Sequence, residues 1–541
     1  MLAVALALLG AVPTVKPIDA AELRGHIRFL ASDLLEGRGP ATNGDRLAEQ
    51  YIASQFEAMG LEPGAPDGGW IQQVEMVGVI GHPETLKLEG PTSTLGLKFK
   101  EDFIVVSGHQ EQDSAVEKAE LVFVGYGITA PEFQWDDLKG TDLRGKVLVM
   151  MNSDPEDDPT IFAGKARLYY GRWGYKYEQA RKQGALGCLL IHTTASAGYP
   201  WQVVQTSWTG EQFDLPAAAE SQLQLKGWLT EGATRKLFAL GGKELDALRT
   251  LANTRKFAPV PLGVSLSSAF TNVVARKVSG NVLGLLRGSD PLLKAEVVIY
   301  TAHHDHLGKK ESGAPGEDLI YNGAVDNASG VAGMLAIARW LSAQTKAPRR
   351  SILFAAVAAE EQGLLGSQYL VEHPPVPPGM MTANLNLDGL NIWGKTRDVS
   401  VIGLGKTTLD GMIRDFARAQ GRTVKPDALS DRGFFYRSDQ FNFARQGVPS
   451  AWFSSGQDFV GRSQGWGREQ REKWEATHYH QPSDELRDTW DLSGAVEDVK
   501  LFLELGLAVA NGAVAPSWIR GDEFEATRKK SLESSGRQAQ P

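Results

Sequence analysis

The sequence predicts an α/β protein whose central sheet is largely parallel. From about Thr271 onward, apolar runs alternate with polar or glycine-bearing loops and then with amphipathic helices. The runs are almost continuously apolar, which is typical of strands buried on both faces of a parallel sheet. They read AEVVIYTA, SILFAAVAA, ANLNL, DVSVIGL and PSAWFSS. A chain of 541 residues also exceeds what one hydrophobic core organises, so we expect two domains.

The N-terminus, MLAVALALLGAV, has the length of a secretory signal core and is too short for the roughly 20 residues that span a bilayer. Residues 1–20 are therefore predicted to be a signal peptide, and the protein to be exported to the periplasm or secreted. Because no basic residue precedes the apolar core, a buried first helix or a wrongly assigned start codon is the alternative. We expect no membrane span in the mature protein.

Two helices are predicted between Ile18 and about Pro63, on either side of a GRGP break. Asn43 is expected to cap the second helix and Gly60 to end it. Short alternating runs from about residue 70 to 118 indicate strands. Residues 21–118 and 263–515 are assigned to one discontinuous domain.

Residues 119–262 are predicted to form an inserted domain, because strand-rich segments such as GKVLVMMN and GCLLIHTT are separated there by Gly, Pro and Trp. The only cysteine, Cys188, lies in one of these runs and is expected to be a buried strand residue, which excludes an internal disulfide framework. Beyond Pro516 the chain is charged and Ser-rich, so residues 516–541 are predicted to be a disordered tail.

The charge distribution argues against nucleic acid as a partner. The net charge of −9 arises from 56 basic and 65 acidic residues that are mixed along the chain, with no basic stripe to neutralise phosphates.

Metal-ligating side chains follow the predicted strands. The carboxyl ends of parallel strands meet at one edge of the sheet, and ligands bind at that edge. We expect two divalent cations there, with Asp326 of GAVDNASG as the carboxylate that bridges them. One cation would also take His303 and Asp388, and the other Glu361 and His480. Three carboxylates, two divalent ions and a bridging hydroxide make a neutral cluster, which limits the desolvation penalty.

Imidazole and carboxylate ligands favour two zinc ions, with cobalt or manganese as substitutes. Successive side chains at a strand end diverge, so Glu360 is free to act as general base and acid while Glu361 binds metal. Asp305 is expected to accept the other ring N–H of His303. The remaining histidines near these motifs are expected to be packing or rim residues: His304, His306 and His478.

These motifs resemble the di-zinc aminopeptidases of the M28 type. The similar stretches are AHHDH, GAVDNASG, AAEEQGLLGS, NLDGL, RSDQFNFARQGVPSAWF and YHQPSDE, together with the N-terminal GRGP segment. The resemblance implies a three-layer α/β/α zinc-exopeptidase sandwich with a mixed, centrally parallel sheet, and the insert resembles a β-rich protease-associated (PA) domain. It also implies an oxyanion-stabilising role for Tyr479 and a substrate-binding role for Arg437.

The predicted function is therefore a metallo-aminopeptidase acting on peptides with a free N-terminus. Its oligomeric state and side-chain preference are not encoded in any recognisable pattern. Three alternatives stay open: a carboxypeptidase that uses Arg432 and Arg437, a glutaminyl cyclase of the same superfamily, and a non-catalytic receptor or scaffold. The cyclase is disfavoured because the ligand set serves two metals, whereas the resemblance implies that cyclases use one zinc.

Overall fold

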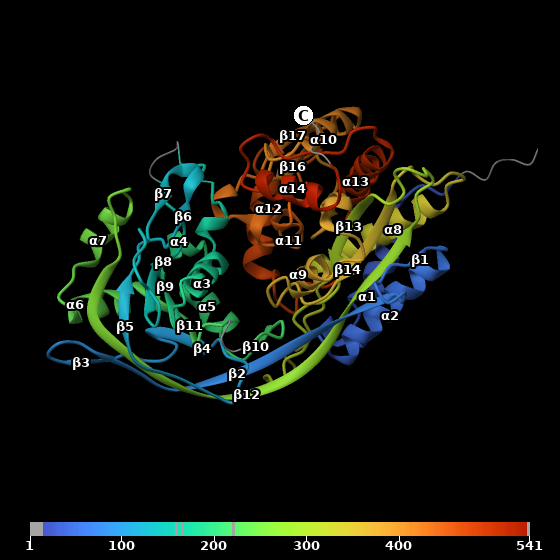
Figure 1. Ribbon diagram of the computed structural model, residues 1–541. Helices are drawn as coiled ribbons and strands as arrows, with labels where there is room; N and C mark the ends of the chain where they lie inside the picture. The colour runs from blue at the N-terminus through green and yellow to red at the C-terminus, as the bar shows by residue number, and fades with distance from the viewer. Residues whose placement is uncertain (1–14, 157–160, 165, 219–221, 538–541) are drawn as a thin grey trace, which may run out of the picture.

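The computed structural model describes residues 15–156, 161–164, 166–218 and 222–537. These residues form two lobes that share two long antiparallel strands, β2 (Ile71–Glu89) and β12 (Val260–Leu286). In Figure 1 this ribbon runs along the base of the molecule from one lobe to the other. The two lobes are therefore connected through one continuous sheet.

The larger lobe contains the predicted sheet. Its strand order is β17-β16-β18-β15-β13-β14-β12, and each of the five predicted apolar runs forms a strand. The middle strands β14, β13, β15 and β18 are parallel to one another, whereas β16 is antiparallel to β18 and β12 is antiparallel to β14. This confirms the α/β class and the mixed, centrally parallel sheet. The strand bounds are β13 (Val297–His303), β14 (Ser351–Val357), β15 (Met381–Asn386), β16 (Asp398–Ile402), β17 (Thr423–Pro426) and β18 (Ser450–Ser455).

Helices cover both faces of this sheet, so the lobe has three layers. Alternate residues of β13 belong to two different cores: Val298 and Tyr300 pack with one helical layer, and Val297 and Ile299 with the other. The first layer comprises α1 (Ala20–Leu30), α2 (Asn43–Ala58), α8 (Gly330–Ser342), α10 (Leu409–Ala419) and α13 (Ser493–Asn511). The second comprises α9 (Leu365–Glu372) and α11 (Gln440–Arg445).

The first two helices form where the sequence predicts them, with one correction. Thr42, and not Asn43, is the N-cap of α2, because the Thr42 hydroxyl accepts the backbone N–H of Asp45 at 3.3 Å. Asn43 is the first helical residue. Gly60 follows the end of the helix with a φ of 75°, a left-handed conformation that favours glycine.

The second lobe is larger than the predicted insert of residues 119–262. Its core extends from Leu88 to Phe270, and its sheet has the order β5-β8-β9-β11-β4. The boundary differs because β2 and β12 belong to both lobes, which a change of sequence texture does not reveal. Cys188 is buried in β9, as predicted. The main elements are β4 (Phe103–Ser107), β5 (Asp113–Phe123), β8 (Val147–Met151), α3 (Trp173–Lys182), β9 (Gly187–His192), β11 (Leu225–Thr230), α6 (Glu231–Leu240) and α7 (Leu245–Ala252).

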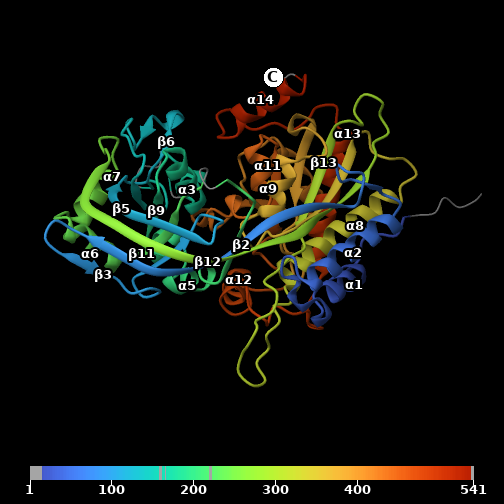
Figure 2. The same ribbon diagram turned by 60° about the horizontal axis from the view of Figure 1, so that its bottom comes forward.

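Short elements complete the two lobes. Figure 2 shows α12 lying between the lobes. The remaining bounds are η1 (Asp33–Arg38), β1 (Glu62–Pro63), β3 (Thr94–Gly96), β6 (Thr129–Ala130), η2 (Pro131–Phe133), β7 (Trp135–Asp136), η3 (Tyr169–Gly171), α4 (Thr194–Ala197), α5 (Trp201–Ser207), β10 (Glu211–Asp214), η5 (Ala324–Ser329), η6 (Pro378–Met380), η7 (Ser430–Arg432), η8 (Phe434–Tyr436), α12 (Trp466–Thr477) and α14 (Glu525–Ser534).

The chain ends differ from the predicted boundaries. The predicted signal peptide lies outside the described residues up to position 14, but Ile18 is buried and Asp19 caps α1, so positions 18–20 belong to the fold. The prediction of a disordered tail is wrong for residues 516–537, because Trp518, Phe524 and Leu532 are buried around α14. Across the described ranges, no helix combines the length and apolarity needed to cross a bilayer.

Candidate metal centre

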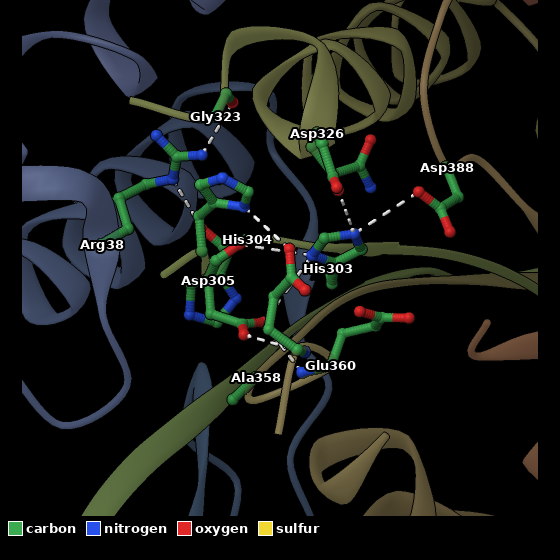
Figure 3. A network of polar contacts seen from close by, with 12 residues as sticks. Arg38, His303, His304, Asp305, Gly323, Asp326, Ala358, Glu360 and Asp388 are labelled. Carbon is green, nitrogen blue, oxygen red and sulfur yellow. Dashed lines mark hydrogen bonds and ion pairs between the residues drawn. The ribbon is translucent and has the colours of Figure 1, made fainter. Parts of the chain in front are cut away.

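The predicted ligands converge at the carboxyl edge of the parallel strands. His303 is the last residue of β13, and Asp388 follows β15 by two positions. Asp326 lies in the turn before α8, and the loop after α12 supplies His480. Figure 3 shows His303 pointing between the carboxylates of Asp326 and Asp388. All of the ligand candidates are therefore within one site.

Two groups of donor atoms share Asp326. The Nε2 atom of His303 is 3.2 Å from Oδ1 of Asp326 and 3.4 Å from Oδ1 of Asp388. The Nε2 atom of His480 is 3.3 Å from Oδ2 of Asp326 and 3.1 Å from Oε2 of Glu361. The two oxygens of one carboxylate therefore face two separate sets of donors.

The donor spacing fits two divalent cations. Around a tetrahedral zinc ion with ligands at about 2.0–2.1 Å, neighbouring donor atoms are about 3.3 Å apart. The Nε2 atoms of His303 and His480 are buried, yet within the described residues they make no hydrogen bond of normal geometry. Unpaired ring nitrogens that face carboxylate oxygens are what a metal site requires before it binds its ion.

The electrostatics of the site also favour cations. Burial lowers the pKa of His480, but the negative charges of Glu361 and Asp326 outweigh this effect and raise it to about 10. Burial raises the pKa of Glu360 well above its usual value, and Glu361 and Asp388 raise it further. A carboxyl group with a raised pKa beside this centre is suited to carrying a proton. Glu360 has a ligand atom within 4.8 Å of those of His303 and Asp388.

Asp305 supports the centre in a different way from the one predicted. The Nδ1 atom of His303 lies 3.2 Å from the backbone carbonyl oxygen of Asp305, and 3.7 Å from its Oδ1. The carboxylate instead accepts the backbone N–H groups of Glu360 at 3.0 Å and of Glu361 at 3.3 Å. The expected hydrogen bond from the His303 ring to the Asp305 carboxylate is therefore not formed, and the carboxylate instead holds the turn that carries Glu360 and Glu361.

His304 and His306, which the sequence analysis treats as packing or rim residues, are both buried and have specific partners. The Nδ1 atom of His306 is 2.8 Å from Oε1 of Glu361, so the ring orients that carboxylate. The Nε2 atom of His304 is 3.1 Å from Oδ1 of Asp45, which lies on α2 beside the buried Glu49. His478 lies at the rim and contacts Ser483. The loop after β13 is thus fixed by partners on three sides.

Two residues that the sequence analysis missed hold the backbone around the ligands. The buried guanidinium of Arg38 donates to the carbonyl oxygens of His304 at 2.7 Å, Asn322 at 2.7 Å and Gly323 at 2.9 Å, and also contacts that of Leu30 (Figure 3). The carboxylate of Asp484 accepts the backbone N–H groups of Val325 at 2.9 Å and Asp326 at 3.1 Å. Arg38 lies in the GRGP break, and Asp484 in YHQPSDE, but neither spacing shows which backbone groups they contact.

Tyr479 and Arg437 lie beside the centre. The ring of Tyr479 stacks on that of His480, with centroids 3.9 Å apart. Desolvation and the negative charge of Asp326 raise the pKa of Tyr479, whereas Arg437 lowers it, and 40% of the residue is still exposed to solvent. Arg432, the other arginine considered as a carboxylate-binding group, instead pairs with Glu475 at 3.1 Å.

The structure thus defines an α/β protein with a candidate two-cation centre at the carboxyl edge of its sheet. Residues 281–503 match the model of Peptidase family M28, so this part of the chain is similar to the peptidases of that family. The matched region contains every predicted metal ligand.

Two curated relatives that are similar to parts of this chain are aminopeptidases by name. The chain is 29% identical over 225 residues to Aminopeptidase YwaD of Bacillus subtilis, covering 40% of this chain and 41% of that protein. It is 35% identical over 116 residues to Aminopeptidase NAALADL1 of Mus musculus, covering 21% of this chain and 14% of that protein. The chain therefore spans less than half the length of these relatives.

Among solved structures, an aminopeptidase from Aneurinibacillus sp. strain AM-1 has a similar backbone. Its sequence is 20% identical and its TM-score is 0.49, and the match covers 91% of this chain and 94% of that one. The zinc aminopeptidase BSAP from Bacillus subtilis has 18% identity, a TM-score of 0.41 and coverage of 94% and 98%.

Proposed function

We propose that this protein is a di-zinc aminopeptidase that removes N-terminal residues from peptides. The observation that carries the proposal is the arrangement of Asp326, whose two carboxylate oxygens each face a separate histidine and carboxylate pair. The M28 match and the names of the curated relatives support the same class of activity.

The residues present fit two zinc ions, with cobalt or manganese as substitutes. His303 and Asp388 would hold one ion, Glu361 and His480 the other, and Asp326 both. When bound, such ions supply Lewis acidity for the scissile carbonyl and acidify a shared water. The protein then has to orient the peptide and move one proton.

Glu360 is proposed to move that proton. Its carboxylate takes the proton from the attacking water and delivers it to the nitrogen of the departing amine. The amides of Glu360 and Glu361 are fixed by Asp305, so the two side chains keep different directions. The hydroxyl of Tyr479 is proposed to donate a hydrogen bond to the developing oxyanion, an interaction worth about 3 kcal/mol in measured cases.

A free N-terminus is favoured because the site is rich in carboxylates. The substrate ammonium or amine would bind near Asp388 and Glu361, whereas an internal peptide bond offers no such group. Arg432 is already neutralised by Glu475, which weakens the carboxypeptidase alternative.

The second lobe is proposed to be a PA-like domain that borders the substrate cleft. It contacts the peptidase lobe through Arg445 and Glu178 at 3.0 Å, and through the rings of Tyr169 and Phe441, whose centroids are 4.7 Å apart. Its role would be to limit which peptides reach the centre.

The test is a panel of aminoacyl chromophores, free peptides and N-acetylated peptides, assayed with and without chelator, together with metal analysis. We expect two equivalents of zinc and hydrolysis of free peptides that chelator abolishes. Equal hydrolysis of acetylated and free peptides would overturn the aminopeptidase assignment. Release of C-terminal residues would indicate a carboxypeptidase, cyclisation of N-terminal glutamine a glutaminyl cyclase, and absence of bound metal a receptor or scaffold.

A further inference from the structure

Two arginines at the boundary between the lobes lack a counterion. Arg172 belongs to the second lobe and Arg437 to the peptidase lobe. Throughout the described ranges, neither side chain makes a hydrogen bond or an ion pair, although both are partly buried. Two other arginines of this boundary have a counterion, since Arg432 pairs with Glu475 and Arg445 with Glu178, and the nearby Arg167 is influenced by the charge of Asp154. Partly buried guanidinium groups without a carboxylate are uncommon, since burial disfavours an uncompensated charge.

Arg437 is held at the rim of the candidate metal centre. It directly follows η8, and its guanidinium carbon lies 5.0 Å from the centroid of the Phe434 ring. The next residue, Ser438, accepts a hydrogen bond from the side-chain amide of Asn386 at 2.8 Å. Asn386 is the last residue of β15, two positions before the ligand Asp388. The backbone of Arg437 is therefore tied to the strand that carries one of the ligands.

Arg172 approaches the same place from the second lobe. It lies between η3 and α3, and η3 packs on the peptidase lobe through Tyr169, whose ring centroid is 4.7 Å from that of Phe441 and 6.2 Å from that of Tyr436. The backbone N–H of Arg167 donates to the carbonyl oxygen of Ser430 at 3.1 Å. The segment before Arg172 is thus bound to the segment before Arg437.

The electrostatics agree with this placement. Burial lowers the pKa of Arg172 to about 9, and the positive charges of Arg437 and Arg167 contribute in the same direction. Burial raises the pKa of Tyr199, and both Arg172 and Arg437 act to lower it. The charges of the two guanidinium groups therefore both act on Tyr199 and on each other, and a bound anion would relieve their mutual repulsion.

We propose that Arg172 and Arg437 together bind a carboxylate of the substrate, so that the preferred substrates are short peptides with an anionic group as well as a free amine. This inference rests on the proposed peptidase function. Arginine is suited to the role because its planar fork binds carboxylates through two parallel hydrogen bonds. The carboxylate is either the C-terminal group of a di- or tripeptide or an acidic side chain. In both cases the second lobe contributes directly to specificity.

The test compares matched substrates on the full-length, zinc-loaded protein. Leu-Leu against Leu-Leu-amide isolates the C-terminal carboxylate, and Glu-Leu-amide against Gln-Leu-amide isolates an acidic side chain. We expect kcat/KM to favour the acid in one of these pairs. Arg172→Gln should lower kcat/KM for that acid by about ten- to a hundredfold, the usual range for a hydrogen-bonded charge, and leave its neutral partner almost unchanged.

Arg181→Gln is the matched control, because it removes the same charge from an exposed position on α3. It should leave all four rates unchanged. Calorimetric binding of Leu-Leu, Leu-Leu-amide, Glu-Leu-amide and Gln-Leu-amide to wild type and Arg172→Gln in chelator provides a readout that does not need turnover. The proposal would be overturned if Arg172→Gln lowered kcat/KM equally for the acid and for its neutral partner. It would also be overturned if neither kcat/KM nor binding affinity favoured the acid in either pair. Failure to hydrolyse any free peptide, with acid-selective binding intact, would instead count against the proposed function alone.

Discussion

Asp305 and Glu360 are joined by a hydrogen bond in which the Glu360 backbone N–H donates to Oδ1 of Asp305 over 3.0 Å. The second oxygen of the same carboxylate accepts the N–H of Glu361. A side chain from the loop after β13 thus fixes the turn after β14. This contact links His303, at the end of β13, to Glu361, in the turn after β14.

Asp305→Asn should therefore weaken the centre without removing a ligand. One oxygen acceptor would be replaced by an NH₂ donor that faces an N–H, so the turn would shift. We expect zinc affinity to fall by about 10- to 100-fold, as for other residues that orient ligands. Competitive zinc titration with a chromogenic chelator measures this. Unchanged affinity together with unchanged kcat would show that the turn holds its shape without Asp305.

Arg38 should matter both for stability and for metal binding. Arg38→Met would leave several buried carbonyl oxygens without a donor, and we expect the free energy of unfolding to fall by about 3 kcal/mol or more. Arg38→Lys should restore only part of this, because one ammonium cannot replace a planar fork. Urea unfolding and zinc titration are the measurements. Arg28→Met, at an exposed position of α1, is the control and should change neither quantity.

Glu360→Gln should separate proton transfer from metal binding. The variant keeps all five proposed ligands, so we expect two zinc ions per chain and a decrease in kcat of about 10²- to 10⁴-fold. Metal analysis and steady-state kinetics on a free-amine substrate measure both effects. A rate equal to that of the wild type would remove Glu360 from the mechanism.

Asp326→Ala should have the opposite pattern. Among the residues that the structure describes, it removes the only carboxylate whose two oxygens face both histidine groups, so both proposed sites lose a donor. We expect metal to be released during dialysis, with folding preserved at low temperature as judged by circular dichroism. A variant that still holds two equivalents of zinc would contradict the bridging role.

The sequence predicted the parallel strands and the convergence of His303, Asp326, Glu361, Asp388 and His480 because both depend on local patterns. Apolar runs mark buried strands, and parallel strands end at a common edge. Contacts between distant segments leave no such pattern. Arg38 and the His304 carbonyl are 266 positions apart, and the partner of Arg38 is a backbone group that any residue would offer.

The predicted boundary between the lobes differs from the observed one for a related reason. Strands β2 and β12 continue through both lobes, so no polar linker marks where one core ends and the other begins. The tail was misread because its few apolar residues, Trp518, Phe524 and Leu532, are widely spaced among charges. Trp518 and Phe524 are buried because they pack against Phe435, Tyr436 and Phe441, which are distant in the sequence.

Glu49 should make the stability of the protein depend on pH. Burial raises its pKa from 4.5 to about 7 in the folded state. Since the folded-state pKa lies above that of the unfolded chain, the stabilising contribution of the protonated group is complete below about pH 4.5 and is lost as the pH rises through 7. Glu49→Gln keeps the group neutral. Relative to the wild type, it should have little effect at pH 4.5 and raise the free energy of unfolding by about 2 to 3 kcal/mol at pH 8.

Urea unfolding of both proteins in chelator, across this pH range, measures the difference while excluding effects of bound zinc. Glu57→Gln, at an exposed position of the same helix, should show no such trend. A difference between Glu49→Gln and wild type that stays constant from pH 4.5 to 8 would mean that Glu49 ionises equally easily in the folded and unfolded chain. The increase with pH is expected because α2 presses this carboxyl group, together with Asp45, against the loop that carries His304.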